Sequence, residues 1–152
     1  MTSDSGHWTY DSGITKSYSS DGVSITSSID KYSVCDVALP TNFRLSLKAK
    51  SNANNDLRYC SVGTWAIANG KYSNINRLML FNTWPPNYYV NNSYTQPNVV
   101  ELEVEYNNGV LTVKKDGTTM ITQAITLADQ VLKLYTGANK IMTIKDIIIE
   151  EL

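Results

Sequence analysis

NVVELEVEYNNGVLTVKKDGTTMITQA, residues Asn98–Ala124, carries the clearest structural pattern in the chain. Apolar residues recur at every second position from Val100 to Tyr106, and glutamates occupy the positions between them. This period of two is typical of a β-strand with one buried face and one solvated face. Asn108-Gly109 follows, and this pair supplies the positive φ angles that a two-residue type I′ hairpin requires. An antiparallel hairpin is therefore expected.

The hairpin also fixes a strand register. With the turn at Asn108-Gly109, apolar side chains meet on one face and opposite charges meet on the other. The expected cross-strand pairs are Tyr106 with Leu111, Val104 with Val113, and Glu103 with Lys114. Asp116-Gly117 repeats the turn signal and leads into a third strand, Thr118–Ala124, so the segment is predicted to be an antiparallel meander.

Segments with similar alternation or a high density of β-branched residues recur along the chain. The strands expected outside the meander are Trp8–Tyr10, Val23–Ser27, Lys31–Val37, Asn42–Ser51, Leu57–Val62, Thr64–Ala68, Arg77–Thr83, Val131–Thr136 and Ile141–Glu150. Ser17–Gly22 is expected as a turn-rich loop, Asn69-Gly70 as a turn, and Thr126–Gln130 at most as a single helical turn. About a dozen short strands indicate an all-β fold, a two-sheet antiparallel β-sandwich or jelly roll.

Chain length and composition indicate the number of domains and exclude some kinds of partner. A chain of 152 residues is expected to form one domain, 1–152, with a loose leader at 1–6. Its 13 Lys and Arg against 14 Asp and Glu give a formal charge of -1, which argues against nucleic acid or a membrane surface as partner. Ser, Thr and Asn make up about three residues in ten, beside 10 Tyr and 3 Trp. This profile is common in extracellular β-proteins and in binding surfaces.

Neither a secretion signal nor a membrane span is visible in the sequence. Met1–Gly6 lacks the basic and apolar regions of a signal peptide, and no apolar run approaches the roughly 18 residues of a span. Export is therefore expected to depend on something outside this stretch, as for a piece of a longer protein or a virion component released by lysis. Cys35 and Cys60 fix neither a disulfide framework nor a compartment. Because each shares a strand face with a valine, buried free thiols are expected.

The run VVELEVEYNNGVLTVKKDGTTM (99–120), followed by LKLYTGANKIMTIKDIIIEEL (132–152), resembles the closing half of concanavalin A-like (laminin G, lectin and glucanase) jelly rolls. In those folds a hairpin of the form strand, NG, strand, DG precedes a final strand that runs back beside the first. The resemblance covers the last third of the chain. It implies a sandwich of the kind found in bacterial surface proteins and phage tail or head proteins, where such domains bind glycans or hold an assembly together.

Glu101-Leu102-Glu103-Val104-Glu105 looks like the E-x-D-x-E signature of laminarinase-type glycoside hydrolases, which belong to the same superfamily. This resemblance implies a nucleophile and a general acid/base at Glu101 and Glu105, which retaining chemistry needs about 5 to 5.5 Å apart. The middle acid is glutamate here, and only a short stretch of chain follows the motif. The expected pair of Glu103 with Lys114 explains the charges without catalysis. A solvated strand face is therefore preferred, and no catalytic residue is assigned.

A second segment, FNTWPPNYYVNNSY (81–94), combines flat aromatic rings with amides. Sugar recognition needs rings for the C–H faces of pyranoses and amides for the hydroxyls, and Pro85-Pro86 stiffens the loop and so lowers the entropy lost on binding. The expected ligand-binding residues are Trp84, Asn87, Tyr88, Tyr89, Asn91, Asn92 and Tyr94. The alternative is that one or two rings cap an open end of the sandwich while the amides satisfy turns.

Other candidate sites are weaker. His7 is the single imidazole and is expected at the surface, although a dyad with Cys35 or Cys60 is the open alternative. The loop Asn52–Asp56 offers oxygens to a calcium ion but contains one carboxylate, so a plain loop is preferred. Trp65 is expected in the core. No metal and no cofactor are assigned.

Three functions remain open, in order of preference. The first is a non-catalytic carbohydrate-binding or receptor-binding jelly-roll module, displayed on a virion (phage tail or head) or cell surface, whose partner is a glycan or a glycosylated receptor. The second is a purely structural virion or adhesin sandwich that contacts other subunits or further copies of itself as a homo-oligomer. The third is a laminarinase-type glycoside hydrolase. An extracellular, virion or cell-surface location is expected, without nucleic acid or membrane insertion.

Overall fold

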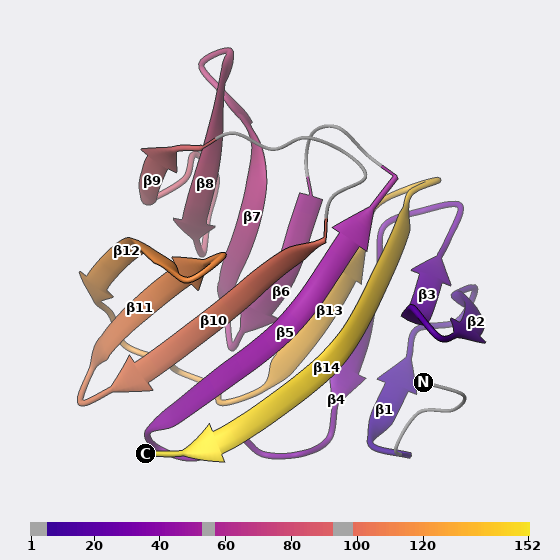
Figure 1. Cartoon of the computed structure of the whole chain (residues 1–152), viewed down its shortest axis with the longest axis horizontal. Helices are drawn as coiled ribbons and strands as arrows, with labels where there is room; N and C mark the ends of the chain where they lie inside the picture. The colour runs from indigo at the N-terminus through magenta and orange to yellow at the C-terminus, as the bar shows by residue number, and fades with distance from the viewer. Residues whose placement is uncertain (1–5, 53–56, 93–98) are drawn as a thin grey trace.

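A computed structural model describes residues 6–52, 57–92 and 99–152, and the strands in these ranges form two stacked antiparallel sheets (Figure 1). In spatial order, sheet A contains β1 (Trp8–Tyr10), β4 (Lys31–Cys35), β13 (Leu132–Thr136), β6 (Leu57–Val62), β7 (Trp65–Tyr72), β8 (Ile75–Phe81) and β9 (Tyr88–Asn91). Sheet B contains β12 (Thr118–Ala124), β11 (Val110–Lys115), β10 (Val100–Asn107), β5 (Phe43–Ser51), β14 (Ile141–Glu151), β3 (Gly22–Thr26) and β2 (Thr15–Ser19). The predicted all-β sandwich is confirmed. Nowhere in the described ranges does a helix occur with the length and apolarity needed to cross a membrane.

The meander of β10, β11 and β12 forms as predicted. Both turns have positive φ angles, 50° and 81° at Asn108-Gly109 and 50° and 78° at Asp116-Gly117. The three expected cross-strand pairs are present: Tyr106 with Leu111, Val104 with Val113, and Glu103 with Lys114. Local alternation and turn chemistry are therefore sufficient to set this part of sheet B.

The core lies between the two sheets, as the strand alternation requires. In β5, Phe43, Leu45, Leu47 and Ala49 point inward and are buried, while Arg44 and Lys48 lie on the outer face. β10 adds further buried side chains from its own inward face. Full burial of such a side chain contributes about 1.5–3 kcal/mol, so a shift of register by one residue would expose the whole row.

The predicted turn at Asn69-Gly70 is wrong. β7 continues through both residues and reverses at Ser73-Asn74, where φ is 52° and 61°. The Asn69 side chain is buried and accepts a hydrogen bond from Asn92. A buried polar partner thus offsets the turn preference of the Asn-Gly pair, and the β7–β8 hairpin extends beyond the neighbouring strands at the top of Figure 1.

Three further expectations need correction. The predicted loop Ser17–Gly22 begins inside β2, which pairs with β3 at the edge of sheet B. Thr126–Gln130 contains no helical turn. β14 lies between β3 and β5 of sheet B, whereas β1 belongs to sheet A, so the final strand does not run beside the first. The aromatic segment also contains a short strand, β9, at the edge of sheet A.

The cysteines and the histidine lie where the sequence placed them. Cys35 and Cys60 are buried free thiols. His7 is exposed, and its Nδ1 lies 3.0 Å from Asp36 Oδ1. Residues 1–5 of the expected leader and residues 53–56 of the candidate calcium loop lie outside the described residues, so both expectations stay predictions.

Candidate functional site

The outer face of sheet A, which points away from the core, has a floor of small side chains. The register places Ala66, Ala68 and Gly70 of β7 opposite Phe81, Met79 and Arg77 of β8, respectively. Ala66, Ala68 and Met79 are buried, although they are not part of the core cluster between the sheets. Two groups of larger side chains surround this floor.

The first group, the aromatic cluster, consists of Tyr72, Phe81, Trp84 and Tyr89. Trp84 meets the rings of Tyr72 and Phe81 edge-on, at centroid distances of 5.7 and 6.0 Å and interplanar angles of 88° and 87°. Tyr72 also contacts Tyr89 at 5.1 Å. Edge-to-face contacts are a favourable aromatic geometry, so they hold the indole in place. Even so, Trp84 is 63% exposed and Tyr89 is 47% exposed. The cluster therefore presents fixed rings to solvent.

The second group is built around arginine. The guanidinium carbon of Arg58 lies 4.3 Å from the ring centroid of Tyr135 and 5.5 Å from that of Phe81, and its Nη1 donates to the Tyr32 hydroxyl at 2.6 Å. Phe81 contacts both Arg58 and Trp84, so the two groups form one continuous surface.

Arg77 extends this surface along the aromatic cluster. Its guanidinium carbon lies 4.2 Å from the ring centroid of Tyr89 and 5.4 Å from that of Tyr72. The Nε atom of Arg77 is buried and has no hydrogen-bond partner. Within the described ranges, no carboxylate oxygen lies within 4.0 Å of a nitrogen of Arg58 or Arg77.

One acid does reach the margin of the surface. Asp30 accepts a hydrogen bond from the Tyr135 hydroxyl, and this bond lowers the pKa of Asp30. The backbone N–H of Ala138 at 2.8 Å and the charge of Arg58 lower it further. Asp30 therefore offsets part of the charge of Arg58, whereas Arg77 has no comparable neighbour among the described residues.

The outer face of sheet B is different, because its charged side chains form a network of ion pairs. Glu101 lies 3.6 Å from the ammonium of Lys48, and Glu103 lies 2.7 Å from that of Lys114. Glu105 lies 3.1 Å from Arg44. A hollow of about 500 Å³ opens beside Glu101 and Glu103 on this face. The three glutamates of the hydrolase-like motif thus lie on the outer face, as predicted, and each is in an ion pair.

The alternation of β9 divides the predicted ligand-binding residues. Trp84 and Tyr89 belong to the aromatic cluster, and Asn91 pairs with Arg77 across β8 and β9. Tyr88 points the other way and stacks on Trp65, at 6.1 Å and 24°. Trp65 lies in the core, as predicted. Tyr88 therefore has the capping contacts that the alternative reading describes.

The predicted amides are also divided. The side-chain oxygen of Asn87 accepts the backbone N–H of Asn82 at 3.1 Å. Asn92 donates to Asn69, and its Oδ1 accepts from Lys115 at 3.0 Å. These two amides support the loop and the interior. Tyr94 lies outside the described residues.

Several members of the surface were not among the predicted site residues: Tyr32, Arg58, Tyr72, Arg77, Phe81 and Tyr135. Because a turn was predicted at Asn69-Gly70, Tyr72 was not assigned to the strand that carries Ala66 and Ala68. In the structure, Tyr72 is the last residue of that strand, β7. The alternation of Arg77, Met79 and Phe81 was a usable signal for one outward face. Tyr32 and Tyr135 could not be linked to it, because only the strand order of sheet A brings them near Arg58.

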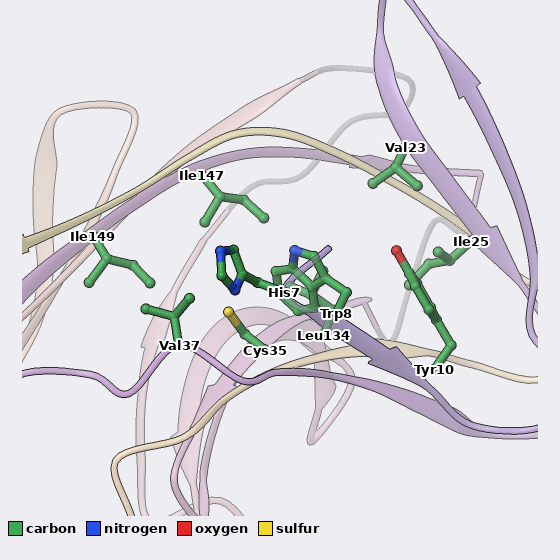
Figure 2. Close-up of a pocket in the computed structure, with 10 residues that line it drawn as sticks. All are labelled: His7, Trp8, Tyr10, Val23, Ile25, Cys35, Val37, Leu134, Ile147 and Ile149. Atoms are coloured by element: carbon green, nitrogen blue, oxygen red, sulfur yellow. The ribbon is translucent and has the colours of Figure 1, made fainter. Parts of the chain in front are cut away.

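A cavity of about 230 Å³ lies between the sheets at the edge formed by β1, β4, β3 and β14 (Figure 2). Figure 2 shows the side chains of His7, Cys35, Val37, Ile147 and Ile149 among those that line this cavity. Burial raises the pKa of the Cys35 thiol, and the charge of Asp36 raises it further. Because a protonated thiol is a poor nucleophile, a Cys35–His7 dyad gains no support. Cys60 does not line this cavity.

Solved structures with the same architecture match nearly the whole chain. The carbohydrate-binding module CBM66 from Bacillus subtilis has a TM-score of 0.71 at 10% sequence identity, over 95% of this chain and 96% of that one. The exoplasmic/lumenal domain of VIP36 in its Ca²⁺/Man-bound form has a TM-score of 0.72 at 12% identity, over 96% and 83%. Apo Crh5 transglycosylase has a TM-score of 0.76 at 12% identity, over 99% and 81%.

The fold is a concanavalin A-like jelly roll. The family resemblance of the closing meander is therefore confirmed at the level of the fold. The sequence itself matches no protein-family model and no curated protein. At sequence identities of 10–12%, these structural matches show the fold and do not identify a ligand. The candidate ligand surface is the outer face of sheet A.

Proposed function

We propose that this jelly roll is a non-catalytic carbohydrate-binding module that contacts glycan through the aromatic cluster. The observation that carries the proposal is Trp84, which is 63% exposed while two other rings hold it edge-on. An exposed, rigid aromatic surface loses little conformational entropy on binding and usually marks an interaction site. Among the structural neighbours, CBM66 is a carbohydrate-binding module and VIP36 was solved with Man bound.

A single patch of this kind binds one sugar weakly, so avidity from several copies is part of the proposal. We place these copies on a virion or cell surface, outside the cell, with a glycan or glycosylated receptor as partner. Composition supports this location. A surface rich in Ser, Thr, Asn and Tyr and poor in charge suits an exposed binding protein.

The test is a glycan array on the purified protein and on Trp84→Ala and Tyr89→Ala. Ile148→Ala is the matched control, because Ile148 is 54% exposed on the outer face of sheet B. We expect both aromatic variants to lose most of the array signal with little change in melting temperature, and the control to keep it. Binding that survives both substitutions would remove the aromatic cluster as the site.

The same samples separate the other two functions. Light scattering that shows a stable oligomer, together with an empty array, would favour the structural alternative. Analysis of reducing ends after incubation with β-glucans would detect a hydrolase, and its activity would have to be lost in Glu101→Gln or Glu105→Gln. The non-catalytic proposal expects binding without product.

A further inference from the structure

We propose that the preferred glycan is acidic, with a carboxylate or sulfate group bound by Arg77 while a sugar ring packs on the aromatic cluster. This inference rests on the proposed function and specifies its ligand class. Arg58 would supply a second cation for an acidic group further along the chain of sugars.

The first argument is the distribution of charge between the two outer faces. On sheet B, Arg44, Lys48, Lys50 and Lys114 each lie within 4.0 Å of a carboxylate oxygen. On sheet A, Arg58 and Arg77 have no such ion pair with any described residue. The formal charge of -1 thus conceals one face whose cations are paired and one face on which, among the described residues, Asp30 offsets part of the charge of Arg58 and no acid pairs with Arg77.

The second argument is the surroundings of Arg77. In the strand register its neighbours are Gly70 and Asn91, which carry no charge. Its guanidinium carbon lies 4.2 Å from the ring centroid of Tyr89 and 5.4 Å from that of Tyr72, and its terminal N–H groups have no hydrogen bond or ion pair with a described residue. A guanidinium edge matches the two oxygens of a carboxylate or sulfate, and charge-assisted hydrogen bonds of this kind are about twice as strong as neutral ones.

The third argument is proximity. Tyr72 contacts Trp84 at 5.7 Å and also lies 5.4 Å from the guanidinium of Arg77. A ring stacked on the exposed face of Trp84 or Tyr89 therefore places its substituents near Arg77. Asn91 lies on the same face and can serve a sugar hydroxyl, because its side chain is exposed. One sugar unit can thus engage ring, amide and guanidinium together.

The experiment compares charged and uncharged versions of the same polymer by titration calorimetry. Polygalacturonate is paired with its carboxyl-reduced form, and dextran sulfate with dextran, so that carboxylate and sulfate are tested separately. We expect at least one acidic polymer to bind about tenfold more tightly than its neutral partner, with an advantage that shrinks in high salt.

Variants then assign the effect to the surface. Arg77→Gln should abolish the preference for acid, and Arg77→Lys should restore part of it, because a lysine keeps the charge without the planar edge. Lys50→Gln is the control, since it removes one positive charge from the opposite face. Melting curves show whether each variant folds.

Each remaining outcome has one meaning. Equal binding of the acidic and neutral polymers, unchanged in Arg77→Gln, would overturn the inference and leave the glycan-binding proposal intact. Poly-glutamate that binds as tightly as the acidic polysaccharides would also overturn it, because charge alone would then explain the effect. The absence of binding to every saccharide tested would remove the proposed function itself.

Discussion

The ammonium of Lys115 in β11, a buried residue, donates a hydrogen bond of 3.0 Å to Oδ1 of the half-buried Asn92, directly after β9, and so joins the two sheets. Asn92 in turn donates to Asn69 of β7. Burial lowers the pKa of Lys115 below its ordinary value of 10.5. A cation has therefore been retained between the sheets, beside the C-terminal end of β9, the strand that carries Tyr89 of the aromatic cluster.

This burial predicts a pH dependence of stability. Between the lowered pKa of the folded state and 10.5, the unfolded chain binds more protons at Lys115 than the folded chain does. The contribution of this residue to the free energy of unfolding therefore rises with pH through that window. The free energy of unfolding of wild type minus that of Lys115→Met should become more positive as the pH is raised toward 10.5. Urea titrations at several pH values measure this difference. A difference that is independent of pH would contradict the prediction.

The hydrogen bond itself can be tested at Asn92. Asn92→Ala removes one acceptor of the Lys115 ammonium and the donor to Asn69, so we expect a loss of about 1–3 kcal/mol of stability. Asn91→Ala is the control, because Asn91 is exposed and points away from the interior. Equal stability of the two variants would show that the buried network contributes nothing.

The two thiols should react at very different rates. Burial raises the pKa of Cys60 to about 12, and the residue is fully buried, whereas Cys35 lines the cavity between the sheets. Since the thiolate is the reactive form, Cys60 should resist a disulfide reagent at pH 8 until the protein unfolds, and Cys35 should react slowly in the folded state. Mass spectrometry after timed labelling identifies the modified residue. Rapid modification of Cys60 in the native protein would contradict its burial.

Cys60 also predicts a loss of stability at alkaline pH. Above about pH 9 the unfolded thiol loses its proton, while the folded one keeps it until about 12, so the folded state binds more protons in this window. The contribution of Cys60 to the free energy of unfolding should therefore fall as the pH rises from 9, and Cys60→Ala should lack this part of the slope, although it leaves a small cavity. Urea titrations of the two proteins at pH 8 and pH 10 measure the difference.

Much of the fold follows from local patterns, and the candidate surface follows from them only in part. β10 and β11 were predictable because their alternation and their Asn108-Gly109 turn agree with each other. The turn predicted at Asn69-Gly70 was wrong, because the hydrogen-bond partner of Asn69 is Asn92, which lies in another part of the sequence. Likewise, Trp84 and Tyr89 stand out as exposed aromatics within one segment, whereas Arg58 and Tyr135 are brought together only by the neighbouring positions of β6 and β13. Contacts set by strand order leave no local signal.

Tyr88 and Tyr89 offer the sharpest separation of stability from binding, because adjacent residues of β9 point to opposite faces. Tyr88 stacks on Trp65 of the core, so Tyr88→Ala should cost about 2 kcal/mol of stability. Tyr89 is 47% exposed beside Tyr72 and Arg77, so Tyr89→Ala should cost less than about 1 kcal/mol but weaken glycan binding at least about tenfold. Urea titrations and binding isotherms on both variants measure the two effects independently. The reverse result, with stability lost in Tyr89→Ala and binding lost only in Tyr88→Ala, would place the ligand in the hollow between β9 and β12, which both tyrosines line.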